Sequence, residues 1–117
     1  MDNLPVEALD QVAAYFRALS EPTRLHILSL LRQGERNVGE LATLCDYTSA
    51  NISRHLAVLN KHGLVVREAR GNSVYYRMAD DSVNELCDLV CGNIARQIER
   101  TAGRRQMFMQ MGKQIKK

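Results

Sequence analysis

Two cysteines stand four residues apart in the stretch ELCDLVC, residues 85–91. In an α-helix four residues advance the chain by roughly 400°, so Cys87 and Cys91 are displaced by only about 40° around the axis. Thiolates prefer soft ions such as arsenite, cadmium, lead or mercury, and a third ligand can come from Cys45 or from a partner chain. The spacing therefore predicts a thiol site at Cys87 and Cys91, with Cys45 as a candidate third ligand.

Two other interpretations of this cysteine pair stay open. Persulfide or disulfide chemistry needs only two accessible thiols that can approach each other. Cysteine is also a small and frequently buried residue, and both positions border an apolar stripe that contains Leu86, Val90 and Ile94. The three cysteines of the chain are an odd count, which argues against a structural disulfide framework.

A second group of polar residues follows the short sequence DYT at residues 46–48. Ile52, Leu56 and Leu59 form the apolar side of a predicted helix here. The opposite side is expected to be exposed and to carry side-chain types that bond base edges and phosphates in DNA, namely Ser49, Asn51, Ser53, Arg54 and His55, with Thr48 at the start of the helix. Residues 48–77 carry five basic side chains and one acidic one, which is the basic part of the chain. This concentration of charge is typical of a nucleic-acid partner, and a solvated charged face is the alternative.

The elements that must position these residues follow from periodicity and capping signals. Apolar residues recur at helical spacing over 6–20, and a second helix is expected from a cap at Ser20 to Gly34. A short helix at 37–45 begins with a capping box of Asn37 and Glu40, and Thr48 caps the next helix, which Gly63 ends. The chain then alternates in LVVRE and SVYYRM around the turn ARGN, which predicts a β-hairpin.

Two short helices joined by a turn, with an arginine-bearing hairpin after them, have the form of a winged helix-turn-helix. The hairpin would add Arg67, Arg70, Asn72 and Arg77, which can follow the DNA backbone or enter the adjacent minor groove; Arg70 could meet a phosphate or a base edge. A long helix follows from about residue 82 to 110, with a short basic, Met-rich tail. We expect a mainly α-helical chain with one β-hairpin, forming a single domain over residues 1–117.

Several ordered motifs resemble one known family. The stretches LSEPTRLHILSLL, VGELA and NISRHLAVLNKHGLVVREARGNSVYYRM, followed by ADDSV, are similar to the ArsR/SmtB family of bacterial winged-helix repressors over roughly residues 10–98. The resemblance implies a homodimer paired through the first and last helices. It also implies a twofold-symmetric operator in double-stranded DNA that is released when an inducer binds.

The usual inducer sites of that family are not matched here. Asn37, Gly39 and Ala42 stand where arsenic-sensing relatives carry thiols, and all three histidines precede the hairpin, whereas zinc-sensing relatives use histidine in the last helix. The cysteines remain as the candidate site for As(III) or a soft divalent ion. A persulfide- or redox-responsive repressor, and a protein-association module without a sensor, are the alternatives.

Composition limits the remaining function classes. No stretch approaches the roughly 18 consecutive apolar residues of a membrane span, and the first ten residues lack the features of a secretory signal, so we expect a cytoplasmic protein with no membrane partner. No phosphate-binding glycine motif and no recognisable pairing of nucleophile and base is present, which argues against an enzyme. No cofactor is expected to be required for DNA binding.

Overall fold

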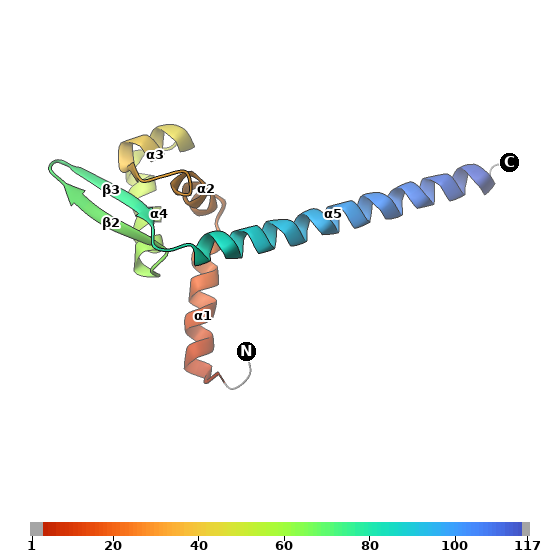
Figure 1. Cartoon of the computed structure of the whole chain (residues 1–117), viewed down its shortest axis with the longest axis horizontal. Helices are drawn as coiled ribbons and strands as arrows, with labels where there is room; N and C mark the ends of the chain where they lie inside the picture. Colours follow the sequence, from red (N-terminus) through yellow and green to blue (C-terminus); the bar gives the residue numbers. More distant parts are fainter. Residues whose placement is uncertain (1–3, 116–117) are drawn as a thin grey trace. The chain divides into compact units, whose positions relative to one another are not determined.

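The computed structural model describes residues 4–115, with side chains through residue 111. Its elements are, in order, α1 (Val6–Leu19), α2 (Pro22–Leu31), β1 (Arg36–Asn37), α3 (Val38–Cys45), α4 (Ser49–Lys61), β2 (Val65–Arg70), β3 (Ser73–Met78) and α5 (Ser82–Ile115). The chain divides into two compact units, Met1–Asp81 and Ser82–Lys117. The first contains the winged helix and the second contains α5 (Figure 1).

The junction between α1 and α2 differs from the sequence prediction in its capping residue. Ser20 follows the end of α1, where its hydroxyl donates to the Arg17 carbonyl at 2.8 Å. The cap of α2 is Glu21, whose carboxylate accepts from the Arg24 backbone N–H at 2.9 Å, and Pro22 occupies the first turn as expected. The prediction of Ser20 as the cap of α2 is therefore wrong, because a carboxylate one residue later accepts the free N–H.

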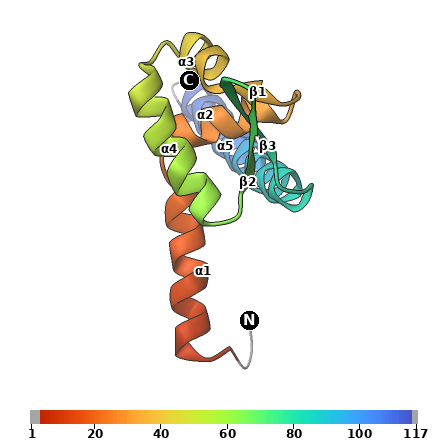
Figure 2. The same cartoon turned by 90° about the vertical axis from the view of Figure 1, so that its left-hand side faces the viewer.

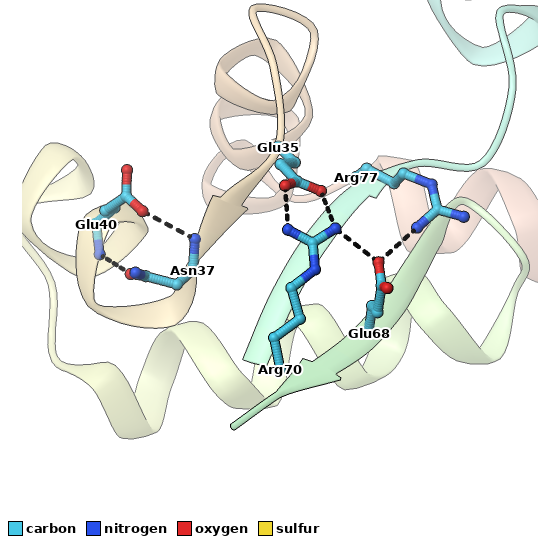
Figure 3. A network of polar contacts seen from close by, with 6 residues as sticks. All are labelled: Glu35, Asn37, Glu40, Glu68, Arg70 and Arg77. Carbon is cyan, nitrogen blue, oxygen red and sulfur yellow. Dashed lines mark hydrogen bonds and ion pairs between the residues drawn. The ribbon is translucent and has the colours of Figure 1, made fainter. Parts of the chain in front are cut away.

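Local capping chemistry builds the helix-turn-helix. Asn37 and Glu40 form the predicted capping box at the start of α3: the Glu40 N–H donates to the Asn37 side chain at 2.8 Å, and the Asn37 N–H donates to the Glu40 carboxylate at 3.3 Å (Figure 3). Asp46 ends α3 in a left-handed conformation with φ of 53°. The Thr48 hydroxyl then accepts from the Asn51 N–H at 3.1 Å and caps α4. The turn between the two helices is thus defined at both ends.

The sheet has three antiparallel strands in the order β1-β3-β2. Strands β2 and β3 form the predicted hairpin, with Val65 opposite Met78 and Arg70 opposite Ser73. Only Gly71 and Asn72 lie in the turn, which is shorter than the predicted ARGN, and Gly71 has the positive φ of 59° that glycine tolerates. The two-residue strand β1, which pairs with Tyr75 and Tyr76 of β3, was not predicted.

The core of the first unit lies between the helices and one face of the hairpin. Helix α4 packs against α2, α3 and β2, and these elements lie together above α1 in the view of Figure 2. Side chains from every one of these layers are buried, and the largest with no appreciable exposure are Ile27, Leu41, Ile52, Leu56, Leu59 and Leu64. The apolar side of α4 therefore joins the other elements into one core.

Helix α5 is continuous over 34 residues and makes up the described part of the second unit. It begins at Ser82, as predicted, and continues past residue 110 to Ile115, so most of the predicted tail is helical. The last two tail residues, 116 and 117, lie outside the described part. Large apolar side chains on α5 are exposed, among them Leu89, Val90, Ile94 and Ile98. Among the described helices, none has an apolar stretch long enough to cross a bilayer.

We expect Leu56→Ala to lower the free energy of unfolding by about 2–5 kcal/mol, because it leaves a cavity in the centre of the core. Urea unfolding at one fixed protein concentration measures the loss. Leu44→Ala on α3, where the leucine is exposed, is the matched control and should change stability by no more than about 0.5 kcal/mol. Equal losses in the two variants would contradict the assigned core.

Candidate DNA-binding surface and thiol pair

The outward side of α4 carries most of the predicted base-reading residues. Ser49, Ser53 and Arg54 are exposed and Asn51 is partly exposed. The Arg54 guanidinium donates through Nη2 to the Asn51 side-chain oxygen at 2.8 Å. Thr48, also exposed, uses its hydroxyl as the helix cap. This side of α4 therefore offers hydroxyls and a guanidinium that a neighbouring amide already orients.

His55 was predicted to be exposed beside Arg54, and this prediction is wrong. The residue is buried, at 9% exposure. Its Nδ1 lies 3.3 Å from Nη1 of Arg24 and 3.7 Å from a carboxylate oxygen of Glu21. The physical reason is the helical position, since His55 comes three residues after Ile52 and four before Leu59 and so belongs to the inward side of α4.

The hairpin, or wing, contains an ion-pair cluster that compensates two of its arginines. Arg70 makes two hydrogen bonds to the carboxylate of Glu35, one of them from Nη2 at 2.9 Å, and a further bond to Glu68 at 2.7 Å (Figure 3). Arg77 lies 3.4 Å from the same Glu68 carboxylate, and the Arg70 guanidinium is 4.9 Å from the centre of the Tyr75 ring. Two carboxylates thus balance two guanidinium groups on one face of the wing.

The hydrogen bonds of this cluster shift the ionisation of its members in the expected directions. The hydrogen bond from Arg70, followed by the attraction of its charge, lowers the pKa of Glu68. Hydrogen bonds to Glu35 and Glu68 raise the pKa of Arg70, which stays charged. A phosphate that binds Arg70 must therefore compete with the two carboxylates that already accept its hydrogen bonds.

Two predicted wing residues lie outside this cluster. Arg67 is exposed and pairs with Tyr76 in the strand register. Because side chains alternate along a strand, Arg67 lies on the opposite face of the hairpin from Glu68 and Arg70. Asn72 is exposed in the tight turn.

Glu35 is a member of the ion-pair cluster that the sequence analysis does not identify. It precedes β1, whose pairing with β3 brings this loop to the hairpin, and two residues are too short to show a strand period.

The three cysteines are distributed between the two units. Cys87 is half-buried and Cys91 exposed, and both lie on α5 at the predicted spacing of one helical turn. Cys45 is the last residue of α3 in the first unit, and burial raises the pKa of its thiol, which lowers its thiolate fraction at neutral pH. Within the described part of a single chain, no three or more His, Cys, Asp or Glu side chains are grouped closely enough to hold a metal ion.

Asn37, one of the three positions compared with a thiol site in the sequence analysis, has a structural role here. Its side chain caps α3 in the box with Glu40, and its backbone pairs with β3. The start of α3 therefore serves as a helix cap and a sheet edge.

Comparison with known proteins gives consistent matches. The profile of the arsR family of bacterial regulatory proteins matches residues 21–66, from the cap of α2 into β2. The HTH-type transcriptional regulator NmtR of Mycobacterium tuberculosis is 39% identical over 85 residues, which cover 73% of this chain and 71% of NmtR. The regulator Rv0324 of the same organism is 43% identical over 82 residues, or 70% of this chain, but this chain spans only 36% of that protein.

A solved structure agrees in fold. The homodimeric winged helix-turn-helix DNA-binding domain of Mb0332 from Mycobacterium bovis superposes with a TM-score of 0.73 at 37% identity, covering 81% of this chain and 88% of that one. The element order, the capped helix-turn-helix and these matches lead to one conclusion. The chain belongs to the ArsR/SmtB family of bacterial winged helix-turn-helix regulatory proteins.

Proposed function

We propose that the protein is a homodimeric transcriptional repressor that binds twofold-symmetric operator DNA through α4 and the wing. A thiol-reactive inducer at Cys87 and Cys91 then releases it. The observation that carries the DNA-binding part is the outward side of α4, where Arg54 is exposed and oriented by Asn51. Residues 47–67 contain no acidic side chain, so nothing within this segment repels a phosphate backbone.

The chemistry of this side of α4 suits the major groove. An arginine can pair with guanine through two parallel hydrogen bonds, while serine hydroxyls bond phosphates or bases. Arg54 has five N–H groups, of which one is given to Asn51, so the others remain for DNA. The wing would add Arg67 and Asn72 directly, and Arg70 after exchange of its carboxylate partners.

Exposed apolar side chains support a homodimer. On α1, Val6 is 70% exposed and Phe16 50%, while on α5 Leu89 is 70% and Ile98 64% exposed. Large apolar side chains grouped on helices in this way mark association surfaces in soluble proteins. A twofold dimer places two reading helices about one turn of DNA, or a multiple of it, apart, and therefore requires a symmetric operator.

The proposed inducer site uses the two thiols of α5. Soft ions such as arsenite, cadmium, lead or mercury favour these ligands, and a second chain or Cys45 would supply the remaining ones. No cofactor is needed for DNA binding itself.

A second candidate for the inducer is a persulfide or an oxidant. It is favoured by the position of two thiols on one helix face, one turn apart.

Recovery of binding sites from a random-sequence DNA library tests the DNA-binding proposal. We expect the wild-type protein to select duplexes with twofold symmetry. Arg54→Ala should then bind the selected duplex about 5- to 150-fold more weakly at fixed salt, as for loss of a paired contact to a base. Arg54→Lys is the matched control: it keeps the charge, so it should retain the salt dependence while losing discrimination between bases. Parental affinity and selectivity in both variants would show that α4 does not read the groove.

Removal of the Glu35 carboxylate should strengthen DNA binding. Glu35→Gln leaves Arg70 with one carboxylate partner in place of two, so a DNA phosphate has one carboxylate fewer to displace. We expect higher DNA affinity and a salt dependence steeper by up to about one unit of slope. Titrations at several salt concentrations measure both. Glu40→Gln removes the same charge from α3 without touching Arg70 and should have a smaller effect. In an Arg70→Ala background the gain from Glu35→Gln should vanish, and a persisting gain would contradict competition for Arg70.

The double variant Cys87→Ser, Cys91→Ser tests the inducer site. It should bind the selected duplex like the wild type, because α4 and the wing are unchanged, and it should no longer be released by arsenite or cadmium. A coupling of about 1–3 kcal/mol corresponds to roughly 5- to 150-fold in affinity, which a titration resolves. A polysulfide challenge in parallel separates the redox candidate.

Two outcomes would contradict the thiol sensor. Release of the double variant at the parental inducer concentration would place the sensor elsewhere. Failure of the double variant to dimerise would favour packing as the role of both thiols. Cys45→Ser, measured beside it, shows whether Cys45 contributes: with Cys45 as a ligand, the inducer concentration for half-release should rise.

A further inference from the structure

A polar cluster joins the end of α1, the start of α2 and the inner side of α4, all within the first unit. The Arg24 guanidinium is its centre. Its Nε donates to the Ala18 carbonyl at 2.6 Å and its Nη2 to the Arg17 carbonyl at 3.2 Å, which are both at the end of α1. Its Nη1 lies 3.3 Å from Nδ1 of His55 in the middle of α4. One side chain therefore connects α1 with the helix proposed to read DNA.

The chemistry of arginine determines the protonation of His55 in this arrangement. A guanidinium has only donors, so Nδ1 of His55 must accept, and the proton of the neutral ring lies on Nε2. The other groups that face the ring are the Glu21 carboxylate, 3.7 Å from Nδ1, and the Tyr47 ring, with centroids 6.2 Å apart. The contact between Arg24 and His55 thus exists only while His55 is neutral.

Glu21 provides the alternative partner for a protonated ring. Partial desolvation raises the pKa of Glu21, but the hydrogen bond from the Arg24 backbone N–H and the attraction of His55 outweigh it and lower this pKa. The carboxylate is therefore ionised near neutral pH. A proton on Nδ1 would face a donor of equal charge on Arg24 and an acceptor on Glu21, so protonation exchanges one partner for the other.

We propose that Arg24 and His55 are positioning residues that hold α4 in its DNA-binding orientation, and that protonation of His55 breaks this link and weakens DNA binding. The proposal rests on the proposed function. His55 directly precedes the buried Leu56 and directly follows Arg54, so a shift of the ring in a packed core moves the backbone that carries Arg54. A buried acceptor such as Nδ1 of His55 favours the arrangement in which it is paired, because leaving it unpaired is unfavourable.

The expected direction with pH follows from the state that binds DNA. Neutral His55 belongs to the DNA-binding arrangement, so DNA affinity is highest when the ring is neutral and falls when the ring gains a proton on acidification. His26 and His62, the other two histidines of the chain, are the same in every variant that is compared. The contribution of His55 is therefore the difference between the wild type and a variant that lacks only this titration.

Three variants of the full chain isolate that difference. His55→Asn places an amide oxygen near the position of Nδ1 and accepts from Arg24 at every pH. His55→Leu fills the buried site without an acceptor. Arg24→Lys keeps the charge but replaces the planar fork, which contacts two carbonyls and the imidazole, by a single ammonium. Affinity for a duplex selected by the wild type is measured at fixed salt from pH 5.5 to 8, with a thermal melt of each protein alone.

We expect His55→Asn to match the wild type at pH 8 and to lose less affinity than the wild type on acidification. His55→Leu and Arg24→Lys should bind about tenfold more weakly at pH 8 while remaining folded, as for loss of one hydrogen bond to a charged group. Parallel pH profiles for wild type and His55→Asn, weak binding by His55→Asn at pH 8, or parental affinity in a folded His55→Leu would each overturn the proposal. If His55→Leu does not fold, the other two variants decide. Failure of the wild type to select any duplex would instead refute the proposed function.

Discussion

Burial of one side of α4 is the constraint on which the first unit depends. Ile52, Leu56 and Leu59 have no measurable exposure, and they meet side chains from α2, α3 and β2 in one core. Because the same thirteen-residue helix must present polar groups on its other side, its rotation about its own axis is determined by the core. The caps at Asn37 and Thr48 set the residues at which α3 and α4 begin. The core therefore determines which side of α4 faces outward, and the Thr48 cap determines where along the chain that side starts.

Charge on the wing shows a different balance from the one that composition suggests. The segment around the hairpin is rich in arginine, yet Arg70 and Arg77 are matched by Glu35 and Glu68. Exposed ion pairs of this kind contribute little to stability, about 0–1 kcal/mol each. Their larger effect is on anion binding by the two arginines, because an anionic ligand must displace a carboxylate that is already bound to the guanidinium. Basic composition alone therefore overstates the charge that the wing offers to a polyanion.

The sequence predicts features that depend on neighbouring residues and misses those that depend on distant ones. The capping box of Asn37 and Glu40, the Thr48 cap and the hairpin follow from spacings of a few residues, and the structure confirms them. Strand β1 has two residues and is defined by its pairing with β3, so it is too short for an alternating pattern to predict it. Glu35 meets Arg70 across 35 positions for the same reason. The spacing of His55 from Ile52 and Leu59 places it on the inward side of α4, even though histidine is a polar residue type that is common on exposed helix faces. The two thiols of α5 share a helix face as predicted, whereas a ligand for them stays a prediction.

The strand order β1-β3-β2 leaves β2 at the border of the sheet. A border strand has unpaired backbone donors and acceptors that can recruit a strand from another molecule, which is a common route to aggregation. Charged side chains at such borders oppose that recruitment, and the C-terminal part of β2 carries three of them: Arg67, Glu68 and Arg70. The residues that tune the charge of the wing therefore also protect its hairpin from intermolecular strand pairing. Apolar, β-branched replacements along β2 would reduce the solubility of the protein even where they leave its fold intact.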